Sequence, residues 1–393
     1  MNELHIDKTH WKRTKIGDLL YKTEYNDKEN ASKQYSKFIK MEHLDANSLN
    51  IHRWGDSSVE DIPPTFYKIF KKGQILYPTR NPQLRRAALA SFDGICGEKT
   101  LTLSLIEGCE GYIPFIAHVF HSSKFIEYAT NARIGSTNPH IRWRDVADYE
   151  FLLPPKAEQK RLAELLWAAD EVVEKEKREM EKLGLFRQSK LKDIFKSANN
   201  HTRLKDLPIE EINGLWKTDD PDSIDVSVIR STEFSDYGTI CFDKLEPMPV
   251  KISQYKTRKL LPSDIIVERS GGGPDQPVGR VCYFEQSEGE YSFSNFTSCI
   301  RVANSDVVLP KYLFYFLEYY WEMGGTDRIQ NQTTGIRNLD YELYKMIKVP
   351  MLSIEGQKQA INVIDQIQQS IFASKAQIEQ SQQIKQELIN KIF

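Results

Sequence analysis

The chain has 393 residues, of which 40% are hydrophobic and 27% charged, so it has room for two or three folded domains. Its net charge of −2 excludes an overall basic character, and any contact with nucleic acid has to rest on local patches of Lys and Arg. Five scattered cysteines without a C-x-x-C pair argue against a disulfide framework or a zinc site and favour a reducing compartment. The polar N-terminal segment and the lack of an apolar run of about 20 residues predict a cytoplasmic protein without a signal peptide or a contact with the membrane.

In chain order, short runs rich in Val, Ile, Tyr, Phe and Thr come first, broken by Gly and Pro, and they predict β-strands. In the first half these runs are SKFIKM, GQILYPT and TLTLSLI. An apolar helix is expected at about 112–130, followed by a polar loop, a short strand and one long helix over 157–195. The second half repeats this order, with strands in DVSVIRS, SDIIVERS, GRVCYF and FTSCIRV, an apolar helix at 310–323 and a long helix over 355–393.

The two halves align as an internal repeat. At an offset of 198 residues Gln159 falls on Gln357, and Phe195 falls on Phe393. Earlier in each half the offset is 190, so that Ile39 meets Ile229 and Arg80 lies beside Arg269–Ser270. The chain is therefore predicted to be one unit of about 195 residues written twice.

The two long helices carry apolar residues at a spacing of seven, which predicts a seam along one side of each helix and a coiled coil. The seam residues are Leu166, Val173, Met180, Ile194, Ile364, Ile371, Ile378 and Ile392. The alternative is that the same stripes belong to ordinary domain cores. We expect an α+β fold with two mixed α/β domains at 1–153 and 199–352 and spacer helices at 154–198 and 353–393.

The sequence lacks the motifs that a self-contained DNA-modifying enzyme needs. IPPTF and LPPK lack the Asn or Asp that precedes the prolines in an amino-methyltransferase loop, and no Lys-Ser or Lys-Thr follows the three glycines Gly271–Gly273. Asp264 and Glu268 are more consistent with strand ends than with a nuclease site, and the eight histidines form no metal-binding pattern. We expect no catalytic residue, no metal site and no cofactor on this chain.

Two basic segments without acidic residues are candidates for contact with DNA phosphates and bases. Arg and Asn directly after a strand suit guanine and adenine edges, and glycines let backbone amides approach a phosphate. The alternative is a solvated basic face. The first segment contributes Lys68, Lys71, Lys72, Tyr77, Arg80, Asn81, Arg85 and Arg86. The second contributes Lys251, Lys256 and Arg258, followed by Arg269, Ser270, Gly271, Gly272 and Gln276.

A polar loop precedes the last strand of each half and is the second candidate surface. Its Asn, Gln, Ser, Thr and Arg side chains can bond both base edges and phosphates, and the loop recurs at matched positions. In the first half it contributes Ser136, Thr137, Asn138 and His140. In the second half it contributes Asn331, Gln332, Thr333, Thr334, Arg337 and Asn338.

The chain resembles the specificity (S) subunit, HsdS, of type I restriction–modification systems. The resemblance rests on the boundaries LLPPKAEQKRLAELL and VPMLSIEGQKQAINVI, each of which opens a long helix ending in SKLKDIF or QELINKIF. VIRSTEF, GSTNPHI and the segment FYKIFKKGQILYPTRNPQLRRAALASFDGICGEKTL also resemble that family's target-recognition domains. The second boundary departs from the usual double proline, having only Val349–Pro350.

The resemblance implies two target-recognition domains separated by two antiparallel helices, with pseudo-twofold symmetry between the halves. Each domain would bind one half of a bipartite, asymmetric sequence in double-stranded DNA. It implies two methyltransferase (M) subunits on the helices, restriction (R) subunits joining through them, and DNA-mimic anti-restriction proteins as further partners. S-adenosylmethionine, ATP and Mg would be bound by the partner subunits, and the methylated adenine would be flipped out of the duplex. The alternatives are the specificity subunit of a related methyltransferase-based phage-defence system, a stand-alone DNA methyltransferase or nuclease, and a coiled-coil scaffold that does not bind DNA.

Overall fold

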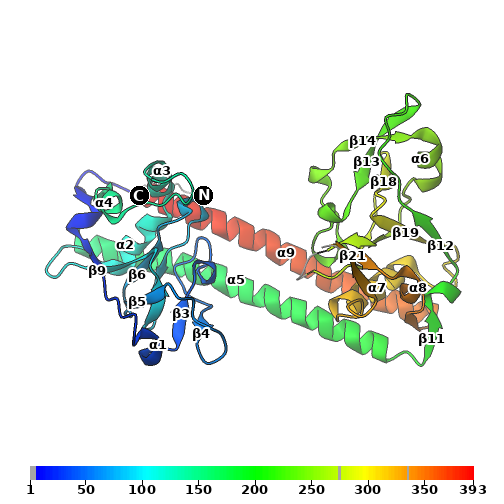
Figure 1. Cartoon of the computed structure of the whole chain (residues 1–393), viewed down its shortest axis with the longest axis horizontal. Helices are drawn as coiled ribbons and strands as arrows, with labels where there is room; N and C mark the ends of the chain where they lie inside the picture. Colours follow the sequence, from blue (N-terminus) through cyan, green and yellow to red (C-terminus); the bar gives the residue numbers. More distant parts are fainter. Residues whose placement is uncertain (1–5, 273–275, 334–335) are drawn as a thin grey trace. The chain divides into compact units, whose positions relative to one another are not determined.

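The computed structural model describes residues 6–272, 276–333 and 336–393. The chain divides into two compact units (Figure 1). Unit 1 comprises Met1–Arg178 and Lys375–Phe393, and unit 2 comprises Glu179–Ser374. Each unit therefore contains one mixed α/β domain together with a piece of both long helices.

Unit 1 is built on two four-stranded sheets, with strand orders β2-β9-β6-β7 and β4-β3-β8-β5, and a separate pair of strands, β1 and β10. The first sheet consists of β2 (Leu20–Thr23), β9 (Thr100–Leu105), β6 (Ile75–Pro78) and β7 (Ala88–Leu89). The second consists of β4 (Gly55–Asp56), β3 (Lys37–Ile39), β8 (Gly94–Gly97) and β5 (Phe66–Phe70). The remaining elements are β1 (Lys12–Lys15), β10 (Glu150–Leu153), α1 (Ala31–Gln34), α2 (Ile113–Ile116), α3 (Ser123–Asn131) and α4 (Trp143–Ala147).

Unit 2 contains sheets with the orders β12-β19-β15-β17, β14-β13-β18 and β16-β21-β20, and the pair β11 and β22. The first sheet consists of β12 (Ile209–Asn213), β19 (Thr297–Val302), β15 (Ile265–Glu268) and β17 (Val281–Tyr283). The second consists of β14 (Pro247–Lys251), β13 (Ser223–Ile229) and β18 (Tyr291–Phe293), and the third of β16 (Ser270–Gly271), β21 (Ile336–Leu339) and β20 (Gln330–Thr333). The remaining elements are β11 (Asn200–Arg203), β22 (Lys348–Met351), α6 (Ile252–Arg258), α7 (Pro310–Glu322) and α8 (Tyr341–Tyr344).

The internal repeat predicted from the sequence is confirmed by the shared topology of the two units. In each unit, the strand that precedes the apolar helical segment pairs with the edge strand of its sheet. These pairs are β9 with β2 in unit 1 and β19 with β12 in unit 2. Each unit also has a parallel pair of strands among antiparallel neighbours, β3 with β8 and β13 with β18. A parallel pair needs a long crossover connection, so its recurrence is a specific likeness between the units.

The helix expected at 112–130 is interrupted, which corrects the sequence prediction. Its residues form α2, a 3-10 segment (Ala117–His121) and α3. Ser122 is the N-cap of α3, because its hydroxyl accepts a hydrogen bond from the Phe125 amide at 3.3 Å. An N-cap residue has extended backbone geometry, which a continuous helix does not allow. The matching segment of unit 2 is the single helix α7.

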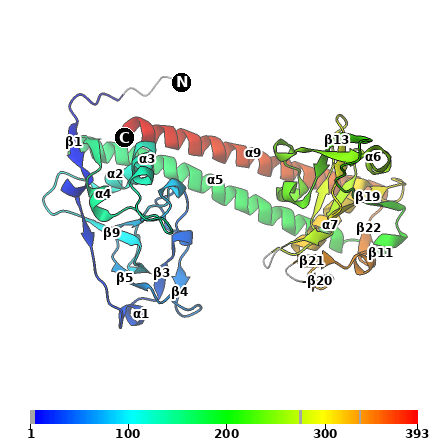
Figure 2. The same ribbon diagram turned by 45° about the horizontal axis from the view of Figure 1, so that its top comes forward.

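The two long helices are α5 (Lys156–Lys196) and α9 (Ile354–Ile392), and within each unit they lie side by side (Figures 1 and 2). In unit 1 the Gln377 amide donates to Glu176 at 2.8 Å, and Lys385 forms an ion pair with Asp170. In unit 2 Arg187 donates to Gln368 at 3.4 Å. Residue numbers rise on α9 as they fall on α5, so the predicted antiparallel pairing holds inside each unit.

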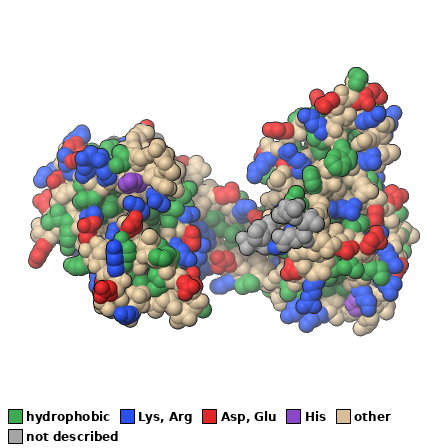
Figure 3. All heavy atoms as spheres, in the orientation of Figure 1, with side chains coloured by type: hydrophobic (Ala, Val, Ile, Leu, Met, Phe, Trp, Pro, Cys, Tyr) green, Lys and Arg blue, Asp and Glu red, His purple; other side chains and the backbone are tan. Residues whose placement is uncertain are grey.

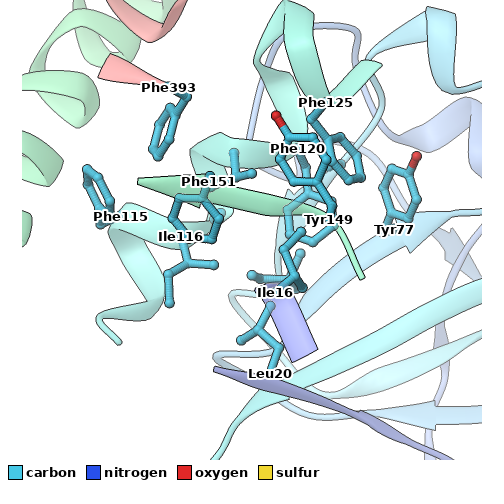
Figure 4. Close-up of a cluster of buried hydrophobic side chains, with 14 of the residues drawn as sticks. Ile16, Leu20, Tyr77, Phe115, Ile116, Phe120, Phe125, Tyr149, Phe151 and Phe393 are labelled. Atoms are coloured by element: carbon cyan, nitrogen blue, oxygen red, sulfur yellow. The ribbon is translucent and has the colours of Figure 1, made fainter. Parts of the chain in front are cut away.

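The predicted seam residues belong to the cores of the two units. Leu166 and Ile392 are buried in unit 1 together with Phe115 and Phe151, and Ile364 and Ile371 are buried in the core of unit 2. Figure 4 shows Phe393 beside Phe115 and Phe151, with ring centroids 4.9 Å and 6.1 Å away. The remaining seam residues, Val173, Met180, Ile194 and Ile378, are buried or half-buried. The stripe is therefore both a helix seam and part of each domain core.

Among the described residues, no helix is long and apolar enough to span a membrane.

Candidate nucleic-acid interface

In unit 1 the end of strand β6 and the polar loop, predicted separately as DNA-contacting surfaces, form one patch. Arg80, two residues after β6, forms an antiparallel bridge with His140. The loop closes on itself because the Ile134 and His140 backbones exchange hydrogen bonds of 2.9 and 3.0 Å. The Ile141 amide also donates to the Thr79 carbonyl at 3.0 Å. We call Arg80, Asn81 and residues 134–140 polar patch 1.

In unit 2 the same two segments also meet. Ser270 pairs with Asn338, and Gly271 with Arg337, so that β16 becomes the edge of the β20–β21 hairpin. The Ser270 hydroxyl donates to the Asn338 side-chain oxygen at 2.6 Å. We call Arg269–Gly272 together with the β20–β21 residues 330–333 and 336–339 polar patch 2. Both patches are built from a strand end and a loop that are distant in sequence.

Two residues that belong to no motif in the sequence support polar patch 2. Arg269 donates to the Asn213 side-chain oxygen at 2.9 Å, and its guanidinium lies 4.3 Å from the ring centroid of Tyr341. Asn213 and Tyr341 lie more than 50 residues from Arg269 in the chain, so no local pattern indicates these contacts. They hold the Arg269 side chain in place beside Ser270.

Two predicted DNA-contacting residues lie in the interior of unit 1. Lys68 is buried, and its ammonium donates to the Glu98 and Thr100 carbonyls at 3.0 and 2.9 Å. Burial lowers the pKa of this lysine. Tyr77 is buried beside Phe120 and Phe125, at ring-centroid distances of 5.1 and 5.6 Å. These side chains do not reach the surface, and we leave both residues out of the proposed interface.

Arg85 and Arg86 brace the fold at the edge of the first basic segment. Arg85 donates to the His121 carbonyl at 2.7 Å and to the Ser123 hydroxyl at 3.0 Å. Arg86 donates to the Met41 carbonyl at 3.0 Å. Asn81 is exposed and adopts a left-handed backbone conformation with φ of 53°, which Asn tolerates better than most residues. Arg80 and Asn81 are therefore better placed to contact a ligand than the two arginines that follow.

Acidic residues from other parts of the fold neutralise part of both basic segments. Lys71 pairs with Asp93 at 2.9 Å, and hydrogen bonds from the Lys72 amide and the Lys71 ammonium lower the pKa of Asp93. Lys251 pairs with Asp220 at 3.1 Å. Cationic and acidic side chains are accordingly interspersed on the face drawn in Figure 3. The electrostatic contribution of these segments is smaller than their composition indicates.

The other predicted residues differ in exposure. Arg258 is half-buried and donates to the Asn213 carbonyl at 3.0 Å. Thr334 lies outside the described residues, as do the side chains of Gln332 and Thr333. The backbones of Gly271 and Gly272 have φ of 131° and 64°, a region that favours glycine. The exposed members are Lys72, Ser136, Thr137, Asn138, Lys256, Gly272, Gln276 and Asn331.

Asp264 and Glu268, considered as nuclease carboxylates, each form an ion pair with an arginine. Arg301 donates to both Asp264 oxygens at 2.8 and 2.6 Å, and Arg280 donates to both Glu268 oxygens at 2.8 and 3.0 Å. Both acids are buried, and such bidentate pairs are typical of structural contacts. Among the described residues, no three His, Cys, Asp or Glu side chains are grouped to hold a metal ion.

Comparison with known proteins gives a consistent class. No protein-family model matches the sequence. The chain is 24% identical over 160 residues to the specificity subunit of the type I restriction enzyme EcoDI from Escherichia coli, covering 39% of this chain and 32% of that protein. It is 22% identical over 191 residues to the putative MjaX specificity subunit of Methanocaldococcus jannaschii, covering 48% of this chain and 44% of that protein. The chain therefore spans less than half the length of these two relatives.

A longer match and two solved structures extend the comparison. The MjaVIII specificity subunit of Methanocaldococcus jannaschii is 22% identical over 311 residues, which cover 70% of this chain and 69% of that protein. The S subunit of a type I restriction–modification system from M. genitalium superposes with a TM-score of 0.55 at 17% identity, covering 99% of this chain and 98% of that one. A chain from a type I R-M system, solved to explain complex assembly and conformational transition, gives 0.61 at 16% identity with 97% of both chains covered.

The fold is that of the S subunits of type I restriction–modification systems. In sequence as well, the chain resembles type I restriction enzyme specificity subunits, as predicted.

Proposed function

We propose that this chain is the DNA-recognition subunit of a type I restriction–modification enzyme and has no catalytic site of its own. The observation that carries the proposal is the construction of the two polar patches. In each unit a strand end bearing an arginine is hydrogen-bonded to a loop that contains Asn and Thr side chains, so that cationic and amide groups lie together at one surface. Arginine and amide side chains supply both phosphate contacts and base-edge hydrogen bonds.

The two patches differ in side chains, which supports an asymmetric, bipartite DNA target. Beside its arginine, patch 1 contains Ser136, Thr137 and His140, whereas patch 2 contains Ser270, Asn331 and Arg337. Different donor and acceptor patterns select different base pairs in the major groove. Each unit would then bind one half-site with its own sequence.

Apolar side chains exposed on the long helices support docking of two M subunits, one on each unit, with R subunits joining through them. In unit 1 Leu165 and Val172 are seven residues apart on α5, which places them on one face, and both are exposed. In unit 2 Leu185 and Phe186 are exposed, and Leu185 lines a cavity of about 530 Å³ with Met180 and Tyr237. Exposed apolar patches of this kind mark interaction sites.

In this assembly, S-adenosylmethionine, ATP and Mg would be bound by the M and R subunits, and the complex would act in the cytoplasm. The test is genome-wide mapping of methylated adenines in host cells with and without the gene. We expect one two-part, non-palindromic motif to lose its methylation when the gene is deleted, and to regain it when the gene is restored.

A motif that stays methylated in the deletion strain would overturn the proposal. The chain purified alone is expected neither to transfer a labelled methyl group to DNA nor to nick it. Activity of the isolated chain in either assay would favour a self-contained enzyme. As a control for docking, Leu185→Asp should reduce the number of M subunits that copurify with the chain from two to one, whereas Lys182→Asp, at a nearby exposed position of α5, should leave it at two.

A further inference from the structure

The turn between β18 and β19 lies directly against polar patch 2, although no motif in the sequence singled it out. The Phe296 carbonyl accepts hydrogen bonds from the backbone amides of Arg269 and Ser270, at 2.9 and 3.1 Å. Phe296 is therefore fixed, through its backbone, to the two residues that begin the patch.

The backbone of this turn is held from several sides. The Thr297 amide and hydroxyl both donate to the Ser294 carbonyl, at 2.9 and 2.8 Å. The Asn295 amide donates to the Leu215 carbonyl at 3.0 Å. Gly214 packs so closely that a Cβ atom there would lie 1.8 Å from the Ser294 carbonyl oxygen. The turn therefore presents its outward side chain from a fixed position.

That side chain is an aromatic ring in contact with solvent. Phe296 is 50% exposed, whereas Phe293, three residues earlier, is fully buried. Trp216, which follows Leu215 beside the same turn, is 65% exposed. Single exposed apolar residues are common, but this one is attached to a patch of Arg, Ser and Asn. In the major groove the apolar group that a base pair offers is the 5-methyl group of thymine, which Phe contacts.

We propose that Phe296 contacts the methyl group of one thymine in the half-site bound by unit 2, and so contributes to sequence specificity. This inference rests on the proposed function of the chain. Arg269, Ser270 and Asn338 supply polar contacts around it, and the ring supplies an apolar contact that hydrogen-bonding groups do not provide.

The matching turn of unit 1 provides an internal comparison. There the Lys99 carbonyl accepts from the Thr79 amide at 2.9 Å, just as Phe296 accepts from Arg269. Lys99 is exposed and forms an ion pair with Glu98 at 3.5 Å, so a contact from this turn to DNA would be with a phosphate rather than a methyl group. The two turns thus have the same backbone role and different side chains.

The test uses the assembled complex of this chain with its M subunits, and a duplex containing the motif found by methylation mapping. Each thymine is replaced in turn by deoxyuridine, which removes only the methyl group. With the wild-type chain we expect one position, in one half-site, to weaken binding about fourfold, the value of one buried methyl group. Phe296→Ala should weaken binding to the thymine duplex about tenfold, because burial of a Phe side chain is worth more than burial of one methyl group.

The decisive result is the combination of the two changes. In the Phe296→Ala complex the same thymine-to-deoxyuridine replacement should have no further effect, and Phe296→Leu should restore most of the binding. Val307→Ala, which truncates another exposed apolar residue of unit 2, should leave binding and its thymine dependence unchanged. Lys99→Ala should lower the salt dependence of binding without altering the effect of deoxyuridine. The thermal unfolding of each variant checks that the fold is intact.

The inference is overturned if Phe296→Ala binds like the wild type, or if the deoxyuridine effect persists in that variant. It is also overturned if no thymine in either half-site weakens wild-type binding when it is replaced by deoxyuridine. In each case sequence-specific binding by the wild-type complex would survive, and with it the proposed function. If the wild-type complex shows no sequence-specific binding, the proposed function itself fails.

Discussion

The buried Arg187 is the clearest point at which a single substitution should loosen unit 2. Its guanidinium, 1% exposed, forms an ion pair with Glu318 of α7 and a second one with Glu322 at 3.4 Å. It also donates to Gln368 of α9. Arg187 therefore connects α5 both to the other long helix, α9, and to α7, the helix that precedes β20 of polar patch 2 in the chain.

Replacing Arg187 with Met preserves the aliphatic volume but leaves Glu318 buried without its partner. Removing one member of a buried ion pair costs roughly 3–5 kcal/mol, because the remaining charge is neither solvated nor neutralised. Burial already raises the pKa of Glu318 to about 7, although Arg187 opposes this rise. Without Arg187 the pKa rises further, so the carboxyl group is neutral in mildly acidic solution and charged only at higher pH.

The loss of stability in Arg187→Met should therefore be larger at pH 8.5 than at pH 6. Hydrogen exchange of the α7 backbone amides measures this loss of stability locally. A loss of roughly 3–5 kcal/mol raises the exchange rate of these amides by about two to four powers of ten. Adding Glu318→Gln should recover much of the loss. Lys182→Met, which removes an exposed cation from the same helix, should change protection by less than about 0.5 kcal/mol. Equal effects of Arg187→Met and Lys182→Met, or an effect independent of pH, would refute this account of the ion pair.

Three further predictions follow from other parts of the structure. In unit 1, burial lowers the pKa of His121 to about 3 and that of His118 well below its ordinary value. In the unfolded chain these imidazoles take up protons near pH 6.5, whereas in the folded chain they do not. The free energy of unfolding should therefore fall by about 1.4 kcal/mol per pH unit and per histidine as pH falls below 6.5. Fluorescence of Trp167, whose ring lies 5.4 Å from that of His118, reports this unfolding, and a flat profile between pH 6.5 and 5 would contradict it. Gly214→Ala should lower the free energy of unfolding of unit 2 in urea by about 1–3 kcal/mol, because the new Cβ would clash with the Ser294 carbonyl. Gly184→Ala should be neutral or stabilising, because its Cβ would meet only the Tyr237 hydroxyl at 3.4 Å. Arg80→Ala should weaken specific DNA binding by roughly 1–3 kcal/mol with little change in melting temperature. Arg85→Ala should lower the melting temperature, because it leaves the His121 carbonyl without its hydrogen-bond donor. An equal fall in melting temperature for Arg80→Ala would show that Arg80 has a structural role.

The sequence by itself was sufficient for the features that depend on periodicity and repetition. Seven-residue spacing in 157–195 and 355–393 predicts two long helices, because a helix places such residues on one side whatever surrounds it. Likewise Gln159 and Gln357, the residues that set the repeat, have matching roles in the structure. Gln159 donates to the Glu110 and Pro154 carbonyls at 3.0 and 2.8 Å, and Gln357 donates to those of Val307 and Leu352 at 3.2 and 3.0 Å.

The tertiary structure decided which of the candidate side chains are available to a ligand. The first basic segment contains no acid, yet Asp93 pairs with Lys71, and Lys68 turns inward to bind two backbone carbonyls. Ser270 and Asn338 were assigned to separate surfaces and form one patch. Each of these outcomes depends on residues 22 to 68 positions apart in the chain. A local pattern carries information about the secondary structure and the exposed face of its own segment, whereas ion pairing and burial of a polar side chain depend on which distant strand the fold places beside it.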